Sequence, residues 1–145
     1  MTYTQQSLDV HVTGRRVVAT LIDGLVLSIV SYFITQIFGT ESTASGFDYT
    51  RLSFGGSLLV AAATVLYYIL MEGLTGRTLG KMATGIRVVD EATGNRPSLG
   101  AATIRTLLRF VDGLFGYLVG FVIVLSTSRR RRLGDMAAKT QVVRG

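Results

Sequence analysis

An aspartate inside the first long apolar run is the feature that most constrains the fold of this chain. The run extends from Val17 to Phe38, and Asp23 is its only charged residue. A helix of this length measures about 33 Å, which is enough to cross a bilayer. An ionisable side chain at that depth is energetically expensive unless it is paired or serves a function. The sequence therefore predicts a membrane-spanning helix in which Asp23 has a specific role.

A second apolar run, Phe54 to Met71, contains no charged residue and would be about 27 Å long as a helix. We expect this run to be the second span. The polar loop between the runs, residues 39–54, contains only one of the 15 basic residues, Arg51. Because basic residues concentrate on the cytoplasmic side of a membrane, the sequence predicts a cytoplasmic N-terminus and an external loop.

A third apolar stretch, Leu114 to Leu125, is only about 18 Å long and too short to span comfortably. It follows a segment, Ser98 to Val111, that Pro97 and Ser98 are expected to start as a helix. A reversal at Asp112–Gly113 would keep the basic tail, residues 127–145, in the cytoplasm. We therefore expect a single all-α membrane domain over residues 1–145, with spans at 17–38 and 54–71 and a re-entrant or interfacial helical hairpin at about 98–126.

Two short segments have the alternation of a strand. Gly85 to Val89 is followed by turn-forming residues, and Thr140 to Val143 has a similar pattern near the end of the chain. Both lie on the side of the spans that is expected to be cytoplasmic. The sequence predicts that they pair into a short cytoplasmic β-sheet.

The composition argues against several functional classes. The chain has no cysteine, and His11 is its only histidine, so no thiolate or histidine cluster is available for catalysis or metal binding. Thr75–Met82 resembles a phosphate-binding loop, but its glycine spacing is one residue short. The basic residues flank apolar runs and accompany no nucleic-acid-binding motif. We therefore expect neither an enzyme nor a binder of a cofactor, a metal or nucleic acid.

Four polar residues form one stripe on the first predicted helix. Thr13, Arg16, Thr20 and Asp23 recur at spacings of three, four and three, so they project from the same face. One hypothesis is an ion or proton site centred on Asp23. The other is a structural contact that orients the helices and is satisfied by an arginine from the third segment.

A second charged stripe lies in the first limb of the expected hairpin. Arg105, Arg109 and Asp112 are spaced by four and three residues, with apolar residues between them. This pattern is typical of an interfacial helix whose arginines reach lipid phosphates. Alternatively, one of the two arginines pairs with Asp23 across a helix interface.

A cluster of four consecutive arginines, Arg129, Arg130, Arg131 and Arg132, follows the third apolar stretch. Such a cluster beside a membrane is expected to bind anionic lipid headgroups at about 1 kcal/mol per residue. Asp135 follows the cluster closely. It is expected either to pair locally with Arg132 or to reach back to Arg15 or Arg16 at the same membrane face.

The order of these residues resembles the RDD family of bacterial membrane proteins, which is named for one arginine and two aspartates. Arg16 and Asp23 match the arginine and the first aspartate, and Asp135 matches the second. Lys139 departs from the family pattern, which usually has a small residue there. The resemblance covers roughly residues 14–144, including Gly76–Lys81, Gly85–Asp90, Arg96–Ser98 and Arg105.

The resemblance implies a multi-pass protein of the bacterial inner membrane, without enzyme activity or cofactor. It also implies a transport role, with cation/proton exchange as the proposed reaction for some family members. Asp23 would be the exchanging carboxylate and Arg16 its tuning charge. Because two spans cannot enclose a pathway, this function requires a homo-oligomer. The alternatives are a non-catalytic subunit of a larger membrane complex, in which Arg16, Asp23 and Asp135 hold helices together, and a lipid-binding membrane protein.

Overall fold

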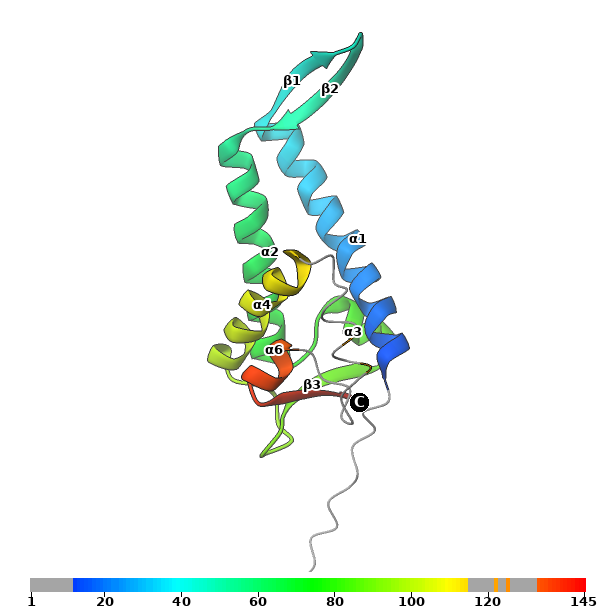
Figure 1. Cartoon of the computed structure of the whole chain (residues 1–145), viewed down its shortest axis with the longest axis vertical. Helices are drawn as coiled ribbons and strands as arrows, with labels where there is room; N and C mark the ends of the chain where they lie inside the picture. Colours follow the sequence, from blue (N-terminus) through cyan, green and yellow to red (C-terminus); the bar gives the residue numbers. More distant parts are fainter. Residues whose placement is uncertain (1–11, 115–121, 123–124, 126–132) are drawn as a thin grey trace, which may run out of the picture.

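Two long helices dominate the molecule, and a β-hairpin joins them at one end (Figure 1). Helix α1 covers Thr13–Phe38 and α2 covers Phe54–Thr75, so both predicted spans are confirmed as continuous helices. The computed structural model describes residues 12–114, 122, 125 and 133–145. At about 39 Å and 33 Å, both helices are long enough to cross a bilayer.

The surface of α1 is apolar over most of its length. Leu21, Leu25 and Ile29 are each more than half exposed, and so are Phe33 and Ile37 further along the helix. A helix of a water-soluble protein would bury such side chains, whereas a lipid-facing helix can leave them exposed. In contrast, Arg16, Ala19 and Asp23 are the buried residues of α1, so its polar face is directed into the protein.

The connection between the spans, predicted only as a polar loop, is a folded β-hairpin. Strands β1 (Gly39–Ala44) and β2 (Phe47–Leu52) pair antiparallel. Ser45 and Gly46 form the two-residue turn, and both have a positive φ, as the tight turn of a hairpin requires. The Ser-Gly pair between threonine- and tyrosine-containing segments is the signal that identifies this hairpin in the sequence.

A small polar platform lies at the opposite end of the long helices (Figure 1). It begins with the short helix α3 (Leu79–Thr84), which was not predicted from the sequence. Strands β3 (Ile86–Asp90) and β4 (Thr140–Arg144) then pair antiparallel, which confirms the predicted sheet. Apolar residues of the sheet pack beneath the start of α1, and they form the buried cluster Val12, Ala19, Ile86, Val88 and Val142.

Helix α4 (Leu99–Leu114) packs against α2, and the short helix α6 (Leu133–Ala137) packs against α4. Ser98 caps the start of α4 by accepting a hydrogen bond from the Ala101 amide at 3.1 Å, as the Pro-Ser pair predicts. Helix α4 continues through Asp112 and Gly113, where the break was expected, and its described part ends at Leu114, one residue later. A glycine inside a helix costs only about 1 kcal/mol and does not by itself end it. The return limb of the hairpin lies largely outside the described residues and remains a prediction.

Candidate functional site

Asp23 is the central acceptor of a hydrogen-bond network between three helices. Its carboxylate accepts hydrogen bonds from the hydroxyl groups of Tyr67 at 2.7 Å and Thr78 at 2.6 Å. The backbone amide of Gly80 donates a third bond at 2.8 Å. Because Asp23 is only 1% exposed, these donors replace water as partners of its charge. Asp23 therefore attaches α1 to α2 and α3 at once.

The two hydroxyl groups that contact Asp23 also organise the start of α3. Thr78 is the N-cap of this helix and accepts a hydrogen bond from the Lys81 amide at 3.3 Å. The hydroxyl oxygen of Tyr67 accepts one from the Leu79 amide at 3.1 Å. The segment that resembled a phosphate loop is therefore a helix start that binds an internal carboxylate.

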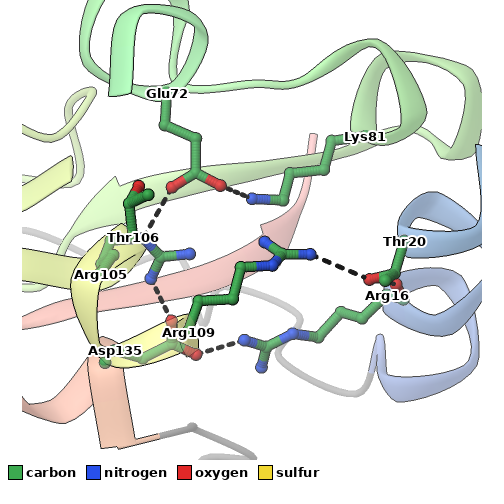
Figure 2. Close-up of a pocket in the computed structure, with 9 residues that line it drawn as sticks. Arg16, Thr20, Glu72, Lys81, Arg105, Thr106, Arg109 and Asp135 are labelled. Atoms are coloured by element: carbon green, nitrogen blue, oxygen red, sulfur yellow. Dashed lines mark hydrogen bonds and ion pairs between the residues drawn. The ribbon is translucent and has the colours of Figure 1, made fainter. Parts of the chain in front are cut away.

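A chain of buried ion pairs lies beside this network and extends from α3 to the start of α1 (Figure 2). Glu72 near the end of α2 pairs with Lys81 and with Arg105, whose Nε lies 2.9 Å from the carboxylate. Arg105 also pairs with Asp135, which in turn pairs with Arg16. Each carboxylate thus binds two cationic side chains of the described part of the chain. All five side chains are at most 9% exposed, so every charge in the chain depends on its neighbours.

The environment shifts the pKa of the two central cations in opposite directions. Burial favours the neutral guanidine of Arg105, but the neighbouring Asp135 and Glu72 outweigh this effect and raise its pKa. Burial of the Lys81 amine, together with the positive charges of Arg105 and Arg109, lowers its pKa from 10.5 to about 8 despite the attraction of Glu72. Lys81 therefore releases its proton at a lower pH than an exposed lysine does.

Arg109 differs from the other cations because it has no carboxylate partner among the side chains that the structure describes. Its guanidinium carbon lies 4.1 Å from the centre of the Tyr68 ring, which is a cation–π contact. One Nη donates a long hydrogen bond, 3.5 Å, to the hydroxyl oxygen of Thr20 (Figure 2). These contacts hold Arg109 in place without neutralising it.

A cavity of about 40 Å³, which we call the ionic cavity, lies between these charged side chains. Its volume exceeds the roughly 10–15 Å³ that a single water requires. Four cationic and two anionic side chains line it, so its walls carry an excess of two positive charges at neutral pH. The charged lining residues are Arg16, Glu72, Lys81, Arg105, Arg109 and Asp135.

The structure brings the predicted site residues together in a way that differs from the sequence-based expectation. Asp135 does reach back to Arg16, as one of the alternatives predicted, whereas Arg15 donates to the Thr84 carbonyl at 2.6 Å. The alternative in which Asp23 pairs with an arginine is wrong, because uncharged donors, the Tyr67 and Thr78 hydroxyl groups and the Gly80 amide, bind its carboxylate.

The prediction that the arginines of α4 snorkel toward lipid phosphates is wrong for Arg105, because the two buried carboxylates bind its guanidinium inside the protein. The side chain of Asp112 and the cluster Arg129, Arg130, Arg131 and Arg132 lie outside the described residues. Their predicted roles therefore stay predictions.

Sequence reasoning missed Tyr67, Glu72, Thr78 and Lys81 as members of the site. Glu72 carried a signal, because an acid at the end of an apolar span requires a cation, and Lys81 is a basic residue close after it. The role of Thr78 was detectable as a helix-capping residue, because it stands directly before the apolar Leu79. Tyr67 offered no such signal, since an aromatic residue within an apolar run is ordinarily lipid-facing or packed.

Two long apolar helices with charged groups bound between them define a small integral membrane protein. The chain belongs to the RDD family, whose sequence pattern matches residues 11–139. The resemblance drawn from Arg16, Asp23 and Asp135 is therefore confirmed.

Two relatives illustrate how the family domain occurs in other proteins. The chain is 31% identical to a proline-rich antigen of Mycobacterium leprae over 81% of its own length, but spans only 46% of that protein. It is 30% identical to the uncharacterized protein YxaI of Bacillus subtilis, with 88% of this chain and 93% of the relative aligned. No solved structure matches the chain.

Proposed function

We propose that this protein binds an anionic ligand in the ionic cavity. The observation that carries the proposal is the excess of positive charge around Arg109, which contacts a tyrosine ring and a hydroxyl group but no described carboxylate. An unneutralised guanidinium in a low-dielectric site is stabilised when an anion enters. A phosphate or carboxylate group fits the planar, forked donors of an arginine.

The positions of the other charges support the same function. Arg16 and Arg105 are held by Asp135, Lys81 is held by Glu72, and Arg109 is held by the Tyr68 ring and Thr20, so all four cationic groups are fixed around the cavity before a ligand arrives. Fixed donors lose less conformational entropy on binding than flexible surface side chains do. The ionic cavity thus has the preorganisation of a binding site as well as its charge.

Thermal unfolding in a neutral detergent tests this proposal with inorganic phosphate as the probe. Phosphate should raise the Tm of the wild-type protein at constant ionic strength relative to chloride, and Arg109→Gln should remove the increase. Arg51→Gln is the matched control, because Arg51 also lies over a tyrosine ring, that of Tyr49, but on the exposed β-hairpin. Equal phosphate responses in the two variants, or no response in the wild type, would overturn the proposal.

Cation/proton exchange at Asp23 ranks second. Both carboxylate oxygens accept hydrogen bonds from hydroxyl or amide groups, and a metal cation would have to displace these donors. The exchange function predicts that Asp23→Asn abolishes cation-driven proton flux in proteoliposomes and that the protein assembles as an oligomer. The non-catalytic subunit function instead predicts unchanged flux and a loss of complex assembly in the same variant.

We further propose that the protein lies in the bacterial inner membrane with its N-terminus in the cytoplasm. The distribution of basic residues supports this orientation, because the β-hairpin contains only Arg51, whereas several basic residues lie at or beside the platform at the opposite end, among them Arg15, Arg77, Lys81, Arg87 and Arg144. Cysteine labelling from outside intact cells tests the orientation. A cysteine at Gly46 should react with an impermeant reagent, and one at Gly94 should not.

A further inference from the structure

A second cavity adjoins the ionic cavity and has a different character. This apolar cavity has a volume of about 390 Å³ and lies between α1, α2 and α4. Its walls include Leu27 of α1, Tyr68 of α2 and Phe110 of α4. The volume lies within the roughly 300–1,000 Å³ range of small-molecule sites. Three residues, Thr20, Thr106 and Arg109, line both cavities.

The ionic and apolar cavities lie next to each other, as the charged headgroup and the apolar acyl chains do in a lipid molecule. The apolar cavity lies beside Gly24 and Leu27, close to the middle of α1, and beside Thr64 and Tyr68 in the central part of α2. It therefore lies at the depth of the acyl chains if these helices cross the bilayer. The ionic cavity lies nearer the start of α1 and the end of α2, at the level of the headgroups. Arg109 stands at the boundary between the two regions.

The geometry points to a single amphiphilic occupant of both cavities: an anionic lipid of the surrounding bilayer, with its phosphate at Arg109 in the ionic cavity and an acyl chain in the apolar cavity. This inference rests on the proposed anion binding and adds the class of the ligand. Gly24 and Phe110 are both exposed, so the apolar cavity opens at the surface that faces lipid. An acyl chain can therefore enter laterally, while charge complementarity selects the headgroup.

The apolar cavity can be filled without altering the ionic one. A Cβ added at Gly24 has no other atom within 4 Å, so a leucine there extends into open space along the cavity wall. Gly55 near the start of α2 has equally open surroundings but does not line either cavity. Gly24→Leu and Gly55→Leu are therefore a matched pair of variants that add the same apolar surface to a membrane helix.

Native mass spectrometry of the protein released from nanodiscs tests this inference. The nanodiscs contain phosphatidylcholine with a minor fraction of phosphatidylglycerol as the anionic probe. Wild-type protein and Gly55→Leu should retain one phosphatidylglycerol, in preference to phosphatidylcholine. Gly24→Leu should reduce this retention at least tenfold and should still show the phosphate-dependent rise in Tm.

The outcomes separate the lipid inference from anion binding itself. Loss of both responses in Arg109→Gln, with loss of lipid alone in Gly24→Leu, supports a lipid that occupies both cavities. Undiminished phosphatidylglycerol retention in Gly24→Leu would overturn the inference, even if inorganic phosphate still stabilises the protein. Equal retention of phosphatidylcholine and phosphatidylglycerol by the wild type would likewise overturn it. An absent phosphate response in the wild type would instead count against the proposed anion site.

Discussion

Arg16 and Asp135 are separated by 119 residues in the sequence and form a buried ion pair between α1 and α6. The pair joins the first membrane helix to a helix close to the end of the chain. Asp135 also binds Arg105 of α4, so one carboxylate connects three helices. Two residues of the family pattern are therefore direct partners, and the third, Asp23, belongs to the neighbouring hydrogen-bond network.

The losses of stability from replacing each partner of this ion pair alone should sum to more than the loss from replacing both partners together. Asp135→Asn leaves the buried guanidinium groups of Arg16 and Arg105 without the carboxylate that both bind. We expect the unfolding free energy to fall by about 3–5 kcal/mol. Arg16→Gln should cost less, because Arg105 still pairs with Asp135. The loss of stability in the double variant should be smaller than the sum of the two single losses by about 0.5–3 kcal/mol.

Chemical denaturation in mixed micelles measures this coupling in a double-mutant cycle. Arg144→Gln is a suitable control, because Arg144 is exposed at the end of β4 and should change stability by less than about 0.5 kcal/mol. Strict additivity of the two single variants would show that the ion pair does not link α1 to α6 energetically.

Replacing Asp23 should destabilise the protein more than replacing an exposed aspartate of the same chain. Asp23→Ala leaves two hydroxyl groups and the Gly80 amide without their buried acceptor. Unsatisfied buried donors cost about 1–3 kcal/mol each, although the hydroxyl groups can find other acceptors, so we expect a loss of at least about 3 kcal/mol. Asp48→Ala on the β-hairpin, where the carboxylate is exposed and accepts from Thr43, provides the comparison. Similar unfolding free energies for the two variants would contradict the structural role of Asp23.

The elements that the sequence predicted best are those whose local pattern is sufficient to define them. The two spans follow from uninterrupted apolar residues, and α4 follows from the Pro-Ser start and an amphipathic pattern. The β3–β4 sheet was also predicted, although its strands are separated by some 50 residues, because each strand has a clear alternation. Such a local pattern can be recognised in the sequence without knowing how the rest of the chain folds.

The partners of the buried charges were harder to predict. Residues far apart in the sequence can form an ion pair, and the sequence contains several charged residues that could be the partner in each case. One of the two alternatives for Asp23 was a contact with an arginine, but its donors are the Tyr67 hydroxyl of α2 and the Thr78 hydroxyl and Gly80 amide at a short helix that has no hydrophobic periodicity of its own. Lys81 in that helix then pairs with Glu72. Without α3 in the expected fold, the donors to Asp23 cannot be deduced, and Lys81 is only one of several cations that could pair with Glu72.

Close packing between α1 and α3 makes Gly80 a position where even one methyl group should be destabilising. A Cβ at Gly80 would lie 2.0 Å from the carbonyl oxygen of Ala19 and 2.9 Å from the Asp23 carboxylate. Because the first of these atoms belongs to the backbone, α3 would have to move away from α1 and stretch the Asp23 network. Gly80→Ala should therefore lower the unfolding free energy by about 1–3 kcal/mol.

Gly100→Ala is the matched substitution for this test, because a Cβ there meets only the Ser98 hydroxyl at 3.8 Å. Alanine favours a helix over glycine by up to about 1 kcal/mol, so this variant should be neutral or slightly more stable. The two variants are compared by thermal unfolding in the same detergent. A Gly80→Ala protein as stable as Gly100→Ala would show that α1 and α3 are not packed this closely.

The lowered pKa of Lys81 predicts how stability depends on pH in the alkaline range. Lys81 faces Glu72, Arg105 and Arg109 in the folded protein, where its pKa is about 8, and it returns to 10.5 when the chain unfolds. Below pH 8 the Lys81 amine is protonated in both the folded and the unfolded state, and burial of its charge destabilises the folded state by the full amount. Between pH 8 and 10.5 the folded state releases the proton while the unfolded state keeps it. The unfolding free energy should therefore rise with pH in this window, by up to about 3 kcal/mol.

Denaturation curves between pH 7 and 10.5 measure this contribution as the difference between the wild type and Lys81→Met, which lacks the titrating amine. Lys139→Met, with an exposed lysine replaced, should retain the wild-type slope. Because deprotonation also removes one positive charge from the ionic cavity, phosphate should stabilise the wild type less above pH 8 than below it. A wild-type slope identical to that of Lys81→Met would mean that folding does not lower the pKa of the Lys81 amine, and would contradict this prediction.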